Sequence, residues 1–168
     1  MKTIYIIRHA KSSWADHFLS DFDRTLNARG RQDAPMMANR LKQRGIKPGG
    51  IVSSPAMRAK TTAEVFASTL GFPSGDITFV NELYHAPIST LWSVISWLND
   101  TFDSVALFGH NPGLTELANS MTEKVYIDNL PTCGIFAVQA GCDRWVDFEH
   151  THREFLFFDY PKNIPAID

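Results

Sequence analysis

The chain has 168 residues with 16 Lys+Arg and 18 Asp+Glu, so its formal net charge at pH 7 is −2. This length predicts one domain over residues 1–168. Hydrophobic residues make up 44% of the chain and charged residues 20%, a composition typical of a globular protein rather than a disordered one. The near-neutral charge predicts no nucleic-acid or membrane-surface partner, and no apolar run approaches the roughly 20 residues that span a bilayer. Two cysteines without metal-binding spacing predict neither a disulfide framework nor a metal site, and the absence of a signal-peptide pattern leads us to expect a cytoplasmic protein.

The first half of the chain is predicted to alternate strands with helices. Short apolar runs indicate buried strands, and helical spacing next to capping residues indicates helices. Pro35 lies inside the first predicted helix, where its ring crowds the preceding turn, so we expect a kink there or an end to the first turns. In chain order we expect a strand at 3–7, a loop at 11–24, a helix from Asn27 to about Arg44, a strand at 51–52, a helix from Pro55 to about Leu70 and a strand at 77–80.

The second half begins in the same way and then changes its periodicity. We expect a helix at 88–98, a strand at 104–108, a helix at 114–121 and then antiparallel strands at 135–139, 145–148 and 154–158. Strands that alternate with helices indicate βαβ units and a parallel sheet. The predicted fold class is therefore α/β, as a three-layer α/β/α arrangement with a mostly parallel sheet and antiparallel C-terminal strands.

Cations and histidines follow three of the predicted strands. Arg8 and His9 follow the first strand, Arg58 lies in the first turn of the helix after the second, and His110 follows the fourth. Each residue alone is explained as an ordinary strand end, helix surface or turn residue. Because ligands bind at the carboxyl ends of strands in open α/β sheets, we expect all four at one rim. Forked guanidinium donors and helix N-termini favour phosphate, so the pattern predicts a phosphoryl site.

The same residues resemble the motifs of a known family. Arg8-His9-Ala10 resembles the Arg-His-Gly/Ala signature of the histidine phosphatase superfamily, which has a phosphoglycerate mutase-like fold. The segment from Ser53 to Arg58 resembles its second motif, and the run from Gly109 to Leu114 is most similar to the SixA-type phosphohistidine phosphatases. Weaker matches are Leu26-Asn27-Ala28-Arg29-Gly30 and Glu82-Leu83-Tyr84.

The resemblance implies a phosphatase that needs no metal and no cofactor. His9 would attack phosphorus as neutral imidazole and become a transient phosphohistidine, which water then cleaves. Arg8, Arg58 and His110 would hold the phosphoryl oxygens and spread the developing charge.

The proton donor to the leaving group has two candidates. Glu82 is the first by its place in the acidic motif, and Asp21 is the second, because short family members carry an acidic residue in that segment. Arg24 is predicted as a further phosphate-binding residue, with an ion pair to Asp21 or Asp23 as an equally good interpretation.

The short chain lacks the insertions that cover small-substrate sites in longer relatives, so we expect an open pocket. Ala15 follows Trp14 where many mutase-like members carry Asn, which disfavours a mutase. The predicted partner is a protein that carries phosphohistidine. A small phosphate ester and a phosphate-binding module without turnover are the alternatives, and the sequence indicates no oligomeric state.

Overall fold

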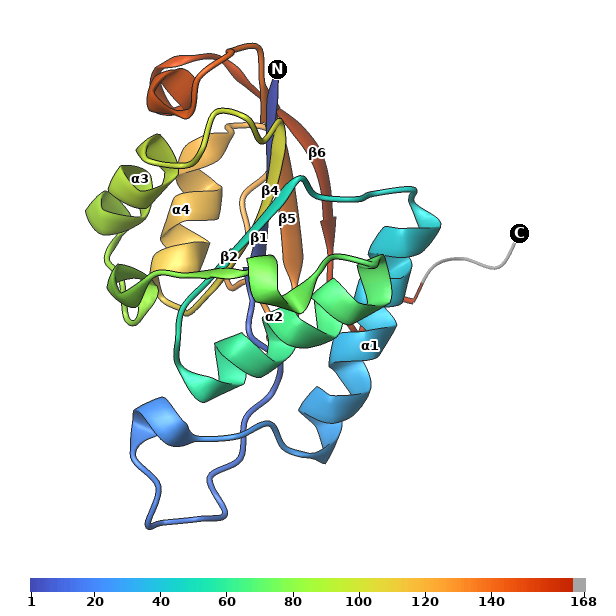
Figure 1. Ribbon diagram of the computed structural model, residues 1–168. Coiled ribbons are helices and arrows are strands. Elements are labelled where there is room, and N and C mark those ends of the chain that lie inside the picture. Colours follow the sequence, from blue (N-terminus) through green and yellow to red (C-terminus); the bar gives the residue numbers. More distant parts are fainter. Residues whose placement is uncertain (165–168) are drawn as a thin grey trace.

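The structure is a computed structural model and describes residues 1–164. Strands and helices alternate along the chain from β1 to α4, and two further strands follow (Figure 1). Their bounds are β1 Lys2–Arg8, α1 Ala28–Gln43, β2 Gly50–Ser53, α2 Met57–Leu70, β3 Thr78–Phe79, α3 Ile88–Ser96, β4 Ser104–Gly109, α4 Gly113–Met121, β5 Ile135–Ala140 and β6 Arg153–Asp159.

The strands form one sheet in the order β3-β2-β4-β1-β5-β6. β1, β2, β3 and β4 run parallel to one another. β5 runs antiparallel to both of its neighbours, β1 and β6. The predicted fold class is confirmed, because the sheet is mostly parallel and its antiparallel pairs are formed by the C-terminal strands β5 and β6.

Helices cover both faces of this sheet. Figure 1 shows α1 and α2 on one side of the sheet, and α3 and α4 on the other. Side chains of β1 alternate between the two faces: Ile4 and Ile6 belong to the core under α3 and α4, whereas Tyr5 and Ile7 belong to the core under α1 and α2. Because both faces are covered, the central strands are apolar throughout.

The predicted strand at 145–148 is wrong, because Trp145–His150 forms a 3₁₀ helix. Trp145 and Phe148 are buried, and their ring centroids lie 5.3 Å apart. Side chains three residues apart lie on the same face of a 3₁₀ turn, so both rings reach the core without a strand. The indole N–H of Trp145 also donates to the carbonyl oxygen of Phe102 at 3.0 Å.

The structure decides between predictions for α1 and corrects the start of α2. α1 continues without interruption through Pro35, so the proline does not end the first turns. α2 begins at Met57 rather than at Pro55, with Ala56 in the N-cap position. The Ser54 hydroxyl oxygen accepts the backbone N–H of Ala56 at 3.2 Å, which holds the preceding segment in a turn.

β3 is shorter than predicted and consists of Thr78 and Phe79 alone. Within residues 1–164, no helix is both long enough and apolar enough to cross a lipid bilayer.

Candidate active site

Two neighbouring parallel strands bring His9 and His110 together. Arg8 and Gly109 are paired in the register of β1 and β4, and the backbone N–H of His9 donates to the carbonyl oxygen of Gly109 at 3.1 Å. The two imidazole rings therefore lie side by side, with centroids 5.2 Å apart. Both side chains are buried, although both belong to loops at the carboxyl edge of the sheet.

The next strand of the sheet, β2, leads into α2 and supplies Arg58. This residue is second in the helix and only 2% exposed. Ser54, just after β2, has its hydroxyl 2.7 Å from Nε2 of His110. The predicted convergence of Arg8, His9, Arg58 and His110 at the carboxyl ends of three strands is what the structure contains.

These side chains line a cavity of about 270 Å³. Its wall is rich in cations and contains one carboxylate, that of Asp21. The lining residues are Arg8, His9, Lys11, Ser12, Trp14, Asp21, Arg24, Arg58, His85, His110, Asn111 and Thr132. The cavity is partly open to solvent, because Lys11, Trp14 and His85 in its wall are exposed, and its excess of positive charge favours an anionic ligand.

The hydrogen bond of His9 determines its tautomer. Nδ1 lies 2.7 Å from the carbonyl oxygen of Ala10, which can only accept, so Nδ1 carries the proton and Nε2 has the free lone pair. Burial lowers the pKa of His9 to about 3, and the hydrogen bond to Ala10 offsets only part of this. The charges of Arg58 and Arg8 contribute to the same lowering of the pKa. At neutral pH the His9 imidazole is therefore uncharged.

His110 is also neutral at pH 7. Burial lowers its pKa to about 2, and the neighbouring His9 and Arg58 act in the same direction. Within the described residues, three buried nitrogens at this site have no hydrogen-bond partner: Nδ1 of His110 and Nε of Arg8 and Arg58. Unpaired buried polar atoms are costly, so this part of the cavity is suited to a ligand that presents several oxygen acceptors.

Asp21 is held at the centre of a network of donors. Its carboxylate accepts from Arg58 Nη2 at 3.1 Å, Arg24 Nε at 3.1 Å and the Tyr84 hydroxyl at 2.5 Å. Burial raises the pKa of Asp21, but the hydrogen bonds from Tyr84 and Arg58 outweigh it and hold the pKa below its usual range. Asp21 is therefore an ionised carboxylate in this arrangement.

Comparisons with known proteins agree with this geometry. The sequence profile of the histidine phosphatase superfamily (branch 1) matches residues 4–85. An uncharacterized chloroplastic protein of Arabidopsis thaliana is 31% identical, over 86% of this chain and 69% of its own length. The crystal structure of a SixA protein from Agrobacterium tumefaciens is 28% identical with a TM-score of 0.81, covering 95% of this chain and 98% of that one.

The chain belongs to the histidine phosphatase superfamily. A protein histidine phosphatase SixA bound to tungstate has the same fold, with a TM-score of 0.80, 23% identity and coverage of 96% of this chain and 98% of that one.

In this member of the superfamily, the structure separates the two predicted proton donors. Glu82 is exposed in the 3₁₀ helix Asn81–Leu83 and does not line the cavity. Asp21 lies in the cavity wall. Arg24 combines both of its predicted interpretations, because it lines the cavity and is ion-paired with Asp21. The role of each residue in proton transfer stays a prediction.

Sequence reasoning gave no role in this network to Ser12 or to the hydroxyl of Tyr84. Arg24 Nη1 donates to the Ser12 hydroxyl at 2.6 Å, and His85 Nε2 lies 3.0 Å from Asp21 Oδ2. Tyr84 stacks on His85 with centroids 4.1 Å apart. The one sequence signal was the position of Tyr84 and His85 directly after the acidic motif, because those two residues, rather than Glu82, turn toward Asp21. Among residues 1–164, no three His, Cys, Asp or Glu side chains form a metal-binding group.

Proposed function

We propose that this protein is a phosphatase that acts through a phosphohistidine at His9 and removes phosphoryl groups from phosphohistidine on a protein. The observation that carries the proposal is the tautomer of His9, whose Nε2 lone pair is available at a cation-lined cavity. Phosphatase activity is also what membership of the superfamily supports.

In the first step, His9 Nε2 attacks phosphorus and the bond between phosphorus and the leaving group breaks. The electron pair of that bond leaves with the departing group, while Arg8, Arg58 and His110 hold the three equatorial oxygens. These residues supply the three unpartnered buried nitrogens, which the phosphoryl oxygens would satisfy.

In the second step, water attacks the phosphohistidine and the electron pair of the P–N bond returns to Nε2 of His9. Inorganic phosphate leaves, and the proton of the attacking water passes to an acceptor. The released phosphate takes up that proton, and the ionised carboxylate of Asp21 can orient the attacking water as a hydrogen-bond acceptor, because the donor network that lowers its pKa leaves it a weak base.

The protonation state of the acidic residues near the cavity favours a phosphoramidate substrate over an alkyl phosphate ester. An alkoxide leaves only with help from a neutral acid, whereas the imidazole of phosphohistidine carries its own ionisable ring. The carboxylate in the cavity wall is ionised, and Glu82 lies outside it. A leaving group that needs little acid catalysis therefore suits this site best.

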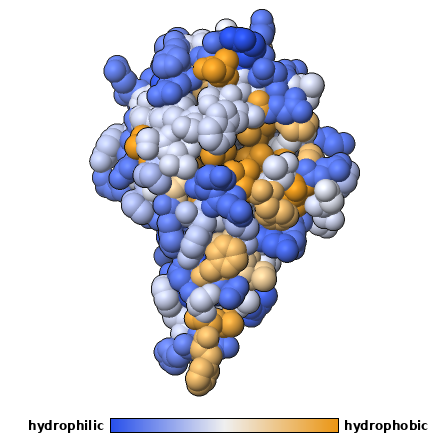
Figure 2. Space-filling model, turned by 60° about the vertical axis from the view of Figure 1, so that its left-hand side comes forward, coloured by the Kyte–Doolittle hydropathy of each residue, from blue (hydrophilic) through white to orange (hydrophobic). Residues whose placement is uncertain are grey.

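An exposed apolar segment beside the cavity supports a protein substrate. The segment between β1 and α1 projects from the molecule, and apolar side chains gather at this narrow end (Figure 2). Phe18 is 100% and Trp14 71% exposed, and Leu19 and Phe22 are also exposed. Arg24 lies 3.5 Å from the centre of the Trp14 ring, which connects the segment to the cavity. Exposed apolar patches are typical of surfaces that contact proteins.

The deciding experiment compares a histidine-phosphorylated protein with an aryl phosphate and a panel of sugar phosphates and nucleotides, each with and without EDTA. We expect the highest kcat/KM on the phosphoprotein and no effect of EDTA. His9→Ala should abolish turnover on every substrate while circular dichroism stays native. Higher kcat/KM on metabolites would favour the small-ester alternative. Binding of phosphate without turnover would reduce the protein to a phosphate-binding module.

Phe18→Ser tests the apolar segment separately from the chemistry. We expect it to raise KM for the phosphoprotein while kcat/KM for the aryl phosphate is unchanged, because Phe18 does not line the cavity. Equal kcat/KM on the phosphoprotein for Phe18→Ser and the parent would remove this argument for a protein substrate.

A further inference from the structure

A second, larger cavity lies beside the first. Its volume is about 570 Å³, and Arg8, Lys11 and Thr132 line both cavities. The second cavity is built where four distant parts of the chain meet: the end of β1, the first turns of α1, the segment at 129–132 before β5 and the segment at 160–162 after β6. A volume of this size is ordinary for a small-ligand site.

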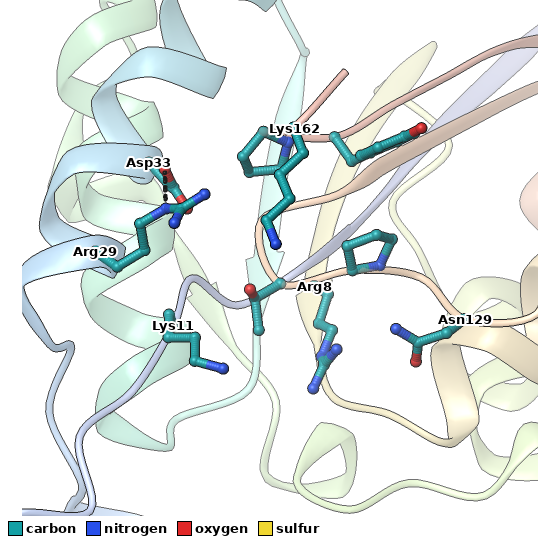
Figure 3. A pocket seen from close by; sticks show the side chains of 10 residues that line it. Arg8, Lys11, Arg29, Asp33, Asn129 and Lys162 are labelled. Carbon is teal, nitrogen blue, oxygen red and sulfur yellow. Dashed lines mark hydrogen bonds and ion pairs between the residues drawn. The ribbon is translucent and has the colours of Figure 1, made fainter. Parts of the chain in front are cut away.

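The charge of this cavity is strongly positive. Its wall contains Arg8, Lys11, Arg29 and Lys162 against one carboxylate, Asp33. Asp33 is buried and engaged by Arg29, whose Nε lies 3.3 Å from Oδ2. Figure 3 shows the Lys162 side chain entering the cavity from the C-terminal side, opposite Lys11 and Arg8. Within residues 1–164, no ion pair involves Lys11 or Lys162.

We propose that this basic cavity binds a second anionic group of the substrate, a carboxylate or a phosphate, while the reacting phosphoryl group lies at His9. The inference rests on the proposed function and deepens it by naming a substrate class, one with two anionic groups. Lys11 and Lys162 would supply most of the attraction, because Arg29 is already paired with Asp33.

Arg8 is the physical connection between the two anion sites. Its Nη1 donates to the Leu130 carbonyl oxygen at 3.1 Å, which fixes the guanidinium in the wall that the cavities share. Lysine ammonium groups are point charges on long stems, so they accept a carboxylate or a phosphate without strict geometry. Two sources offer this chemistry: an acidic side chain near phosphohistidine on a protein, and a second acidic group on a small substrate.

Binding of matched phosphonates tests the inference without relying on turnover. The probes are 4-carboxybenzylphosphonate and its neutral 4-carbamoyl analogue, together with the 3-substituted pair, measured by calorimetry at low salt. We expect a carboxylated probe to bind about five- to tenfold more tightly than its amide, the effect of one partly screened charge pair. The preference should shrink as salt is raised.

Charge reversal at Lys162 gives the matched comparison. Lys162→Glu should abolish or invert the preference for the carboxylated phosphonate. Lys42→Glu makes the same change in net charge at an exposed residue outside both cavities, and it should leave the preference as it is in the parent protein. Equal binding of carboxylate and amide in the parent, or an equal effect of the two charge reversals, would overturn the inference.

Kinetics then separate the sources and the two proposals. Phosphohistidine peptides with Asp or Asn beside the phosphorylated residue, and aryl phosphates with carboxylate or amide, are compared by kcat/KM. A charge preference only among peptides identifies an acidic protein segment, and one only among aryl phosphates identifies a small substrate. Absence of any turnover contradicts the proposed phosphatase function, whereas the phosphonate preference alone decides the second anion site.

Discussion

The guanidiniums of Arg8, Arg24 and Arg58 in the cavity at His9 differ in the groups that accept their hydrogen bonds. Arg8 is held by the Leu130 carbonyl oxygen, and Arg24 is held by the Ser12 hydroxyl and by one carboxylate oxygen of Asp21. Both terminal nitrogens of Arg58 donate to Asp21, one to its carbonyl oxygen and one to its other carboxylate oxygen. A bound phosphoryl group must therefore share the two terminal N–H groups of Arg58 with Asp21. We expect the function of Arg58 to depend on the forked arrangement of these donors more than that of the other two arginines.

Substitution of Arg58 tests this sensitivity. We expect Arg58→Ala to lower kcat by about 10²–10³-fold, the usual cost of one donor that stabilises transition-state charge. Arg58→Lys should recover only part of the loss, because a single ammonium cannot reproduce the forked donors. Steady-state kinetics on an aryl phosphate measure both effects. Parent-like kcat for Arg58→Lys would show that the forked geometry is irrelevant.

The two acidic candidates are distinguished by a pair of conservative variants. We expect Glu82→Gln to change kcat by less than about twofold, because an exposed side chain outside the cavity cannot provide the 10²–10⁴-fold of a general acid or base. Asp21→Asn should lower kcat within that larger range, because it removes the carboxylate that Arg58 and Tyr84 surround.

The measurement is a leaving-group series of aryl and alkyl phosphates with both variants. If Glu82→Gln slows alkyl esters far more than aryl esters, Glu82 donates the proton to the leaving group and the expected small effect of this variant is contradicted.

At the scale of the elements, the packing of α1 against the chain after β1 positions one wall of both cavities. The Asn27 side chain caps α1 by accepting the Gly30 N–H at 2.8 Å, and the backbone N–H of Asn27 donates to the Lys11 carbonyl oxygen at 3.0 Å. A Cβ on Gly30 would overlap that same carbonyl oxygen. The backbone at the start of α1 therefore packs directly against the backbone at Lys11, with no room for a side chain on Gly30.

Gly30→Ala should damage stability and activity together. The added methyl group must push Lys11 away from α1, so we expect a loss of about 1–3 kcal/mol in the free energy of unfolding and a lower kcat/KM. Urea denaturation and aryl phosphate kinetics measure the two effects. Gly75→Ala is the control, because nothing lies within 4 Å of its added Cβ, and it should leave both quantities unchanged. A parent-like Gly30→Ala protein would show that this contact is loose.

At the scale of the whole molecule, the buried neutral histidines make stability depend on pH. The folded pKa values of His9 and His110 are about 3 and about 2, below the unfolded value near 6.5. The unfolded chain therefore binds more protons below pH 6.5, so stability is lost as pH falls. Between pH 7 and pH 5 each histidine should cost about 2 kcal/mol.

Denaturant unfolding at pH 7 and pH 5 tests this dependence. His110→Asn should reduce the difference between the two pH values by about 2 kcal/mol, whatever its effect on stability at pH 7. His17→Asn is the matched control, because this residue belongs to the exposed projecting segment, and its pH dependence should equal that of the parent. An unchanged pH dependence in His110→Asn would show that folding does not lower the pKa of His110.

The sequence by itself determined the parts of this protein that depend on local pattern and chain order. Apolar runs identified β1, β2 and β4, and the order of strands and helices indicated the parallel sheet. The parallel arrangement then required Arg8, His9, Arg58 and His110 to meet at one edge, because residues that follow parallel strands share an edge.

Only the tertiary structure decided which side chains meet across long separations in the chain. The short run at 145–148 has the same apolar character in a strand and in a 3₁₀ helix, and contact with the core determines which forms. Asp21 and Glu82 are equally acidic in sequence, yet the return of the chain from β1 to α1 places only Asp21 against Arg58. The second cavity joins Lys11 to Lys162 through the packing of β5 and β6, a contact that no local periodicity encodes.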